Sequence, residues 1–136
     1  LDRHDRIVRE RLRTYGGREV KHTGDGILAS FSYISKAVDA AVAIQRAFLE
    51  IDDSGPGSRV RIGISAGEPV ERADDLYGAV VNLAARICGH AEAGQTLVSA
   101  AVKELAIGKS LAFIDRGPIS LKGFEEPVGL YQVAEA

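Results

Sequence analysis

Hydrophobic positions along this chain recur with two periods, which separate the expected helices from the expected strands. Residues 2–17 carry apolar side chains at helical spacing between charged ones and end at a glycine pair that suits a C-cap. Residues 35–52 form the clearest amphipathic pattern, with Ser35 as the expected N-cap. Residues 77–94 predict a third long helix, which we expect Gly94 to close.

Shorter segments alternate with period two or form brief apolar runs, which is typical of strands. Asp25-Gly26 lies between the first two of them, and an Asp-Gly pair in that position is a strong signal for a β-hairpin. The polar segment 68–75 is expected to be a loop, and Ser99 can cap a short helix over 100–106. The expected strands are residues 18–23, 26–32, 59–67, 95–99, 111–117, 118–123 and 128–136.

The order of these elements predicts the fold class. Helices and hairpin strands are mixed along one chain, which favours an α+β fold with a mixed or antiparallel sheet and helices packed on one of its faces. A length of 136 residues suits one domain, so we expect a single domain over 1–136.

Composition narrows the class of protein further. A formal net charge of −2 gives no basic field, so we expect no nucleic-acid partner. Cys88 is the one cysteine, which rules out an intrachain disulfide. No apolar run approaches the ~20 residues of a membrane span and no signal peptide is visible, which favours a cytoplasmic location. The chain holds no methionine, so we expect it to begin inside a longer reading frame.

Several polar residues are candidates for chemistry, and each also has a plainer explanation. Asn82 and Arg86 are four residues apart on a predicted helix, so they share one face; that face is also compatible with simple solvation. Lys21 could be an edge-strand lysine that discourages aggregation, and Lys122 a surface lysine beside a turn. Asp25 could be present only because aspartate tolerates tight turns.

Four segments, taken in their order along the chain, favour the chemical roles over the plainer explanations. Together they resemble the catalytic domain of the class III adenylate and guanylate cyclases, bacterial type. The resemblance runs from about residue 5 to residue 133 and implies a ferredoxin-like α+β fold with helices packed on the sheet. The segments that carry it are VKHTGDGILASF, RIGISAGEPV, DDLYGAVVNLAARICGHAEAGQTLVS and LKGFEEPVGLYQV.

The resemblance implies a role for each candidate residue. Asp25 matches the second of two aspartates that bind a pair of divalent ions, Mg²⁺ or Mn²⁺. Lys21 and Asp75 match the pair that reads adenine, which indicates ATP as substrate; guanylate-specific members usually carry Glu at the lysine position and Cys or another small residue at the aspartate position. The remaining matches are Asn82 and Arg86, which act at the transition state, and Lys122, which holds the terminal phosphates.

The resemblance also implies partners and leaves alternatives open. In the family the metal aspartates come from one subunit and the other site residues from its partner, so we expect a homodimer. Family members begin with a strand that bears the first metal aspartate, and this chain opens within the helix that follows it. The strand is expected to precede Leu1, to be disordered, or to be supplied by a partner. A regulatory domain in the full-length protein is a further possible partner. The main hypothesis is an adenylate cyclase; the alternatives are an inactive cyclase-homology module that binds nucleotide, and a ferredoxin-like domain that shares only the architecture.

Overall fold

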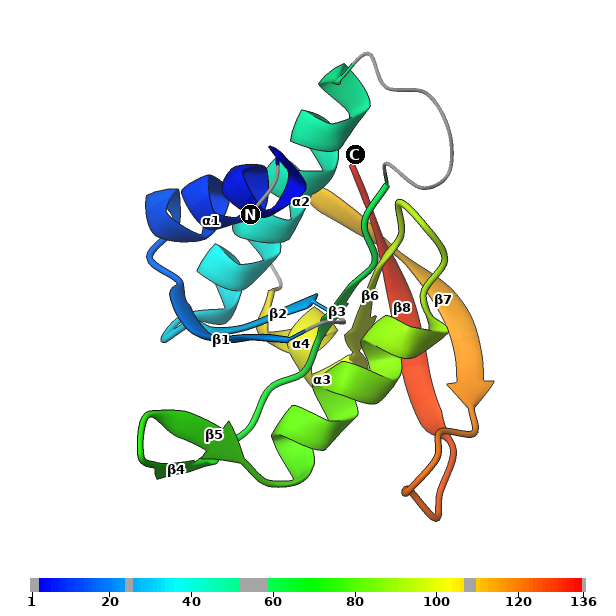
Figure 1. Cartoon of the computed structure of the whole chain (residues 1–136). Helices are drawn as coiled ribbons and strands as arrows, with labels where there is room; N and C mark the ends of the chain where they lie inside the picture. The colour runs from blue at the N-terminus through cyan, green and yellow to red at the C-terminus, as the bar shows by residue number, and fades with distance from the viewer. Residues whose placement is uncertain (1–2, 24–25, 52–58, 107–109, 136) are drawn as a thin grey trace.

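A computed structural model describes residues 3–23, 26–51, 59–106 and 110–135 (Figure 1). No helix within these residues is long and apolar enough to cross a membrane. The helices are α1 (Arg3–Thr14), α2 (Ile34–Glu50), α3 (Ala79–His90) and α4 (Ala100–Leu105). The strands are β1 (Arg18–Thr23), β2 (Gly26–Ser30), β3 (Ile62–Ile64), β4 (Val70–Arg72), β5 (Asp75–Tyr77), β6 (Thr96–Ser99), β7 (Leu111–Ile119) and β8 (Val128–Glu135).

The largest sheet has four strands in the order β3-β6-β8-β7. Strand β3 runs parallel to β6, whereas β8 is antiparallel to both β6 and β7. The hairpin β1–β2 and the short hairpin β4–β5 form two further ladders. This mixture of parallel and antiparallel pairing with helices confirms the α+β class.

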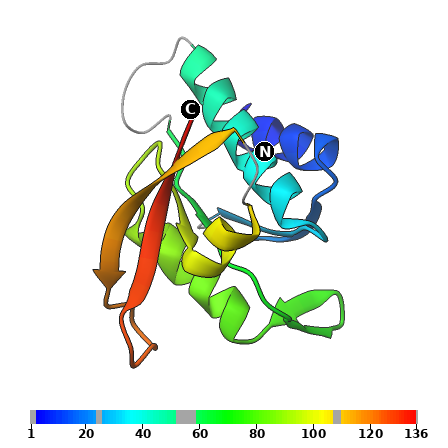
Figure 2. The same ribbon diagram turned by 180° about the vertical axis from the view of Figure 1, so that it is seen from behind.

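Helices cover both faces of the four-stranded sheet, which corrects the expectation of one covered face (Figures 1 and 2). Neighbouring residues of a strand point to opposite faces. On β6, Leu97 packs with Ile87 of α3, whereas Val98 packs with Val38 of α2 and Val102 of α4. Every residue of β6 is buried, as expected for a strand covered on both sides.

The hairpin β1–β2 packs beside the main sheet through a third apolar cluster. Ile27 of β2 and Ile62 of β3 both pack against Leu12 of α1 and Phe48 of α2. Within the described residues, no ladder hydrogen bonds join this hairpin to β3. The amphipathic faces of α1 and α2 therefore hold hairpin and sheet next to each other.

Some element boundaries differ from those expected. Helix α2 begins after Tyr33, so Ser35 is not its N-cap. Helix α3 ends at His90, and Gly94 belongs instead to a turn in which the Gln95 N–H donates to the Glu92 carbonyl. The segments 111–117 and 118–123 contribute to one strand, β7, with an irregularity before Pro118.

The expected loop 68–75 contains a β-hairpin instead. Its strands β4 and β5 have three residues each, too few for a polar segment to show alternation. The turn between them places Ala73 at φ 50° and Asp74 at φ 67°. Two successive positive φ angles are the geometry of a tight two-residue hairpin turn, which usually uses Asn or Gly. The sequence lacks that usual signal, so the hairpin was missed.

Candidate functional site

Lys21 and Asp75 meet although 54 residues separate them in the chain. Lys21 projects from β1 and Asp75 from β5, and the Lys21 Nζ donates a hydrogen bond to Asp75 Oδ2 at 3.1 Å. The side chains are 43% and 24% exposed, so a ligand can reach both. The structure therefore joins the two residues that the sequence assigned to base recognition.

A β-bulge directs Lys21 toward β5. The register of the β1–β2 ladder shifts between Glu19 and Lys21. Glu19 accepts hydrogen bonds from Arg9 of α1, whereas Lys21, two residues later, contacts Asp75 instead. Residues two apart in a regular strand share a face, and an extra residue in one strand breaks that rule. The bulge thus separates the Arg9–Glu19 ion pair from the Lys21–Asp75 pair.

The Asp75 carboxylate is held in its ionised form. The hydrogen bond from Lys21 is the largest cause that lowers the pKa of Asp75, and the Leu76 N–H, 2.7 Å from Oδ1, is the next. An ionised carboxylate accepts hydrogen bonds and an ammonium only donates them. The pair therefore offers one acceptor and one donor side by side, which matches the exocyclic amino group and a ring nitrogen of adenine.

Tyr77 belongs to the same cluster, and the sequence analysis missed it. The Lys21 Nζ lies 5.9 Å from the centroid of the Tyr77 ring. Tyr77 follows Asp75 by two residues on β5, so both side chains project from the same face of the strand. That spacing is the available signal in the sequence, but it indicates a shared face only if residues 75–77 form a strand.

Helix α3 presents Asn82 and Arg86 on its exposed face. The buried face of α3 holds Ile87, with Leu83 partly buried beside it. Both Asn82 and Arg86 are exposed, and neither side chain makes a hydrogen bond or ion pair with the described residues. The helix thus confirms that they are one turn apart and leaves both open to a ligand.

Gly63 fixes the distance between α3 and β3. A Cβ at Gly63 would lie 2.4 Å from the Cys88 nitrogen and 2.8 Å from the Ala84 carbonyl oxygen, both on the α3 backbone. Only glycine permits this approach. The Cys88 thiol beside it is half-buried, and burial raises its pKa, in keeping with a packing residue.

Lys122 occupies a turn that is anchored to α3. The Phe124 N–H donates to the Leu121 carbonyl at 3.1 Å, and Gly123 adopts φ 90°, which glycine tolerates best. Leu121 and Phe124 pack in the same cluster as Ile87 of α3. This packing fixes the base of the exposed Lys122 side chain relative to α3.

Asp25, the expected metal ligand, lies outside the described residues. The ladder describes the hairpin up to the pair Thr23 and Gly26. Among the residues that are described, no three His, Cys, Asp or Glu side chains form a group that could hold a metal. A complete set of metal ligands is therefore not present in the described part of the chain.

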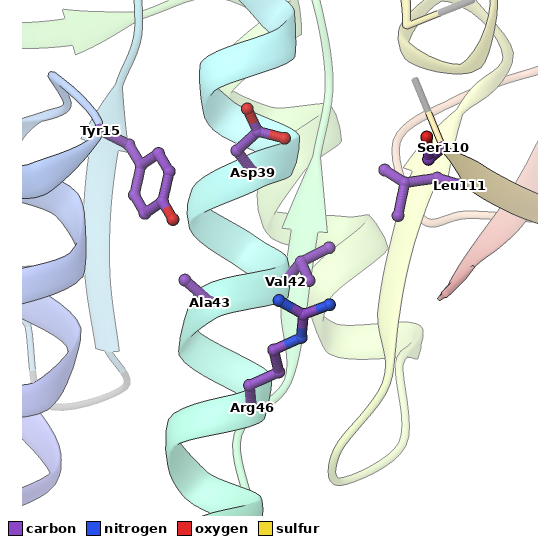
Figure 3. A pocket seen from close by; sticks show the side chains of 7 residues that line it. All are labelled: Tyr15, Asp39, Val42, Ala43, Arg46, Ser110 and Leu111. Carbon is purple, nitrogen blue, oxygen red and sulfur yellow. The ribbon is translucent and has the colours of Figure 1, made fainter. Parts of the chain in front are cut away.

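A cavity of about 360 Å³ lies away from all of these residues (Figure 3). Tyr15, Asp39, Arg46 and Ser110 are among the side chains that line it, and they come from the end of α1, from α2 and from the start of β7. None of the predicted site residues lines this cavity. Among the described site candidates, Lys21, Asn82, Arg86 and Lys122 are exposed, and Asp75 is partly exposed.

Comparison with known proteins identifies the family. The family described as the adenylate and guanylate cyclase catalytic domain matches residues 1–135. A putative adenylate cyclase 3 from Rhizobium meliloti is 34% identical over 119 residues, which cover 85% of this chain and 20% of that protein. An adenylate cyclase from Mycosarcoma maydis is 37% identical over 129 residues, which cover 75% of this chain and 5% of that protein. The chain thus spans a fifth or less of the length of these relatives.

Solved structures agree with this family. An adenylate/guanylate cyclase/hydrolase from Silicibacter pomeroyi superposes with a TM-score of 0.83 at 32% identity, covering 93% of this chain and 78% of that one. An adenylate cyclase from Trypanosoma brucei, described in its monomeric state, gives a TM-score of 0.87 at 27% identity, covering 96% and 76%. The family match and the fold define a nucleotide cyclase domain. The chain belongs to the class III adenylate and guanylate cyclase catalytic domain family.

Proposed function

We propose that this domain is an adenylate cyclase that converts ATP to 3′,5′-cyclic AMP and pyrophosphate at the interface of a homodimer, with residues 1–136 belonging to a single catalytic domain. The observation that supports this most is the contact between Lys21 and Asp75, 3.1 Å apart and both accessible. Together they present the donor and the acceptor that adenine requires. Guanine presents a carbonyl oxygen where adenine has its amino group, so an ionised Asp75 would oppose it.

The exposed residues on α3 suit the chemical step. Cyclisation forms a bond between the ribose 3′-oxygen and the α-phosphorus and breaks the bond to the pyrophosphate oxygen. The Arg86 guanidinium would stabilise charge that develops at the α-phosphate, and the Asn82 amide would place the ribose. Lys122 would hold the terminal phosphates through its ammonium. Positioning and charge stabilisation are the main contributions that such phosphoryl transfers require.

The metal part of the proposal rests on Asp25. Two Mg²⁺ or Mn²⁺ ions, when bound, supply charge neutralisation at the phosphates and activation of the 3′-oxygen. Carboxylate oxygens suit these hard cations. One aspartate does not complete a site for two ions, and the described residues add no group of ligands.

Exchange of the base-recognition pair tests the substrate. In the complete protein, Lys21→Glu with Asp75→Cys should lower the ratio of kcat/KM for ATP over that for GTP by at least about tenfold, since mismatched hydrogen bonds in a binding site cost several kcal/mol. Cyclic nucleotide formation from each substrate measures the ratio. Arg9→Lys, which alters an ion pair between α1 and β1, is the control that should leave the ratio unchanged.

Two results would contradict the proposal. Equal use of ATP and GTP by the unaltered protein would show that Lys21 and Asp75 do not select the base. Nucleotide binding without any cyclic product, in the presence of Mn²⁺, would favour the inactive cyclase-homology module.

A further inference from the structure

The Lys21 ammonium lies between a carboxylate and an aromatic ring. Asp75 Oδ2 is 3.1 Å from Nζ on one side, and the Tyr77 ring centroid is 5.9 Å from it on another. Tyr77 is 50% exposed. Its backbone pairs with Val70 in the β4–β5 ladder, so the ring is carried by a short but regular element.

A lysine side chain by itself recognises a nucleotide base poorly. Its ammonium sits on a flexible four-carbon stem and has three rotatable donors, so a single ion pair with partial exposure does not fix the direction of the remaining donors. Asp75 does not have this problem, because the Leu76 N–H fixes its Oδ1 at 2.7 Å. The group that needs an additional restraint is therefore Lys21, and the Tyr77 ring is a second described group that contacts it.

We propose that Tyr77 is a positioning residue for base recognition: its ring restrains the Lys21 ammonium so that one donor stays directed at the ring nitrogen of adenine. This inference rests on the proposed function. The electrostatic attraction between an ammonium and an aromatic face supplies the restraint. The side chain acts through Lys21 and takes no part in the chemical step, so its loss should raise KM for ATP and leave kcat nearly unchanged.

The test compares Tyr77→Leu with Tyr77→Phe in the complete protein. Leucine removes the ring but keeps an apolar partner for Val70, whereas phenylalanine keeps the ring and removes the hydroxyl. For Tyr77→Leu we expect the ratio of kcat/KM for ATP over GTP to fall about two- to five-fold, the effect of one exposed cation–π contact. Tyr77→Phe keeps the ring but removes the hydroxyl hydrogen bond that helps to lower the pKa of Asp75, so it should lose less of the ratio than Tyr77→Leu. Val70→Ala, which weakens the same hairpin away from Lys21, should leave the ratio unchanged.

A second readout needs no nucleotide. In protein labelled with ¹³C at lysine Cε, the ring should shift the Lys21 ε-proton signal upfield, and the shift should vanish in Tyr77→Leu and persist in Tyr77→Phe. Lys103, whose Nζ lies 5.1 Å from the Tyr131 ring centroid, supplies an internal reference for such a shift.

The outcomes separate this inference from the proposed function. Absence of the Lys21 shift in the unaltered protein, or an unchanged nucleotide ratio in Tyr77→Leu, would overturn the role of Tyr77 while leaving the cyclase proposal intact. A normal Lys21 shift in a protein that uses neither ATP nor GTP would instead refute the proposed function, and the base-recognition role with it. An equal loss of the ratio in Val70→Ala would reduce Tyr77 to a residue that stabilises the hairpin.

Discussion

Mixing an Asp25→Ala chain with an Asn82→Ala chain should restore cyclase activity that each variant lacks alone. In the proposed homodimer, each site takes its metal aspartates from one subunit and Asn82, Arg86 and Lys122 from the other. A mixed dimer then has one site with both lesions and one with neither. Two-fold symmetry sets the ceiling at about half the wild-type activity per mixed dimer. Formation of cyclic AMP after subunit exchange is the measurement.

Two further mixtures serve as controls for this test. Asn82→Ala mixed with Arg86→Ala should not recover, because both residues lie on the same helix and each site of the mixed dimer would carry one lesion. A chain that bears both Asp25→Ala and Asn82→Ala should inhibit the unaltered chain with which it pairs, for the same reason. Recovery in the first control, or none in the main mixture despite proven exchange, would mean that each chain builds its own site.

Gly63→Ala should destabilise the domain. It should also lower the cyclase activity of the protein that remains folded. The alanine Cβ would lie 2.4 Å from the Cys88 nitrogen, and a backbone atom cannot rotate away as a side chain can. Overpacking of this kind costs about 1–3 kcal/mol, which corresponds to a fall in Tm of several degrees in a domain of this size. Because the close atoms belong to the α3 backbone, we expect α3 to move, and a displacement of about 1 Å at a catalytic group can cost on the order of 100-fold in rate.

Gly89→Ala and Gly129→Ala are matched controls for this substitution. Gly89 lies in the same helix, Gly129 lies in β8, and a Cβ at either position would meet no atom within 4 Å. Alanine at Gly89, in the last turn of α3, should leave the stability unchanged or raise it slightly, because alanine is more favourable than glycine in a helix. Thermal unfolding, monitored by circular dichroism, measures the stability of all three variants. A Gly63→Ala domain as stable as Gly129→Ala would show that α3 does not pack tightly on β3.

Local sequence patterns were enough to predict a helix, a strand or a turn wherever its signal lies within a few residues. The hairpin β1–β2 and the amphipathic helix α2 were predicted from alternation and helical spacing, and the glycine pair after α1 does close that helix, since the Gly17 N–H donates to the Leu12 carbonyl. The spacing of Asn82 and Arg86 likewise placed them one turn apart on the same face. The roles of these residues came from the order of four segments along the chain, which no single segment specified.

Contacts between distant segments were decided only by the tertiary structure. Nothing in the local pattern around Lys21 indicates the bulge that turns its side chain from α1 toward β5, because a bulge is a property of two paired strands. The role of Gly63 is likewise set by a helix that follows it by some twenty residues, and the place of Tyr77 by a hairpin too short to show a period. The sequence by itself therefore determined which elements form and which residue types are available for chemistry. Packing decided which of those residues meet, because an ion pair such as Lys21 with Asp75 depends on the positions of two backbones that are separate in the chain.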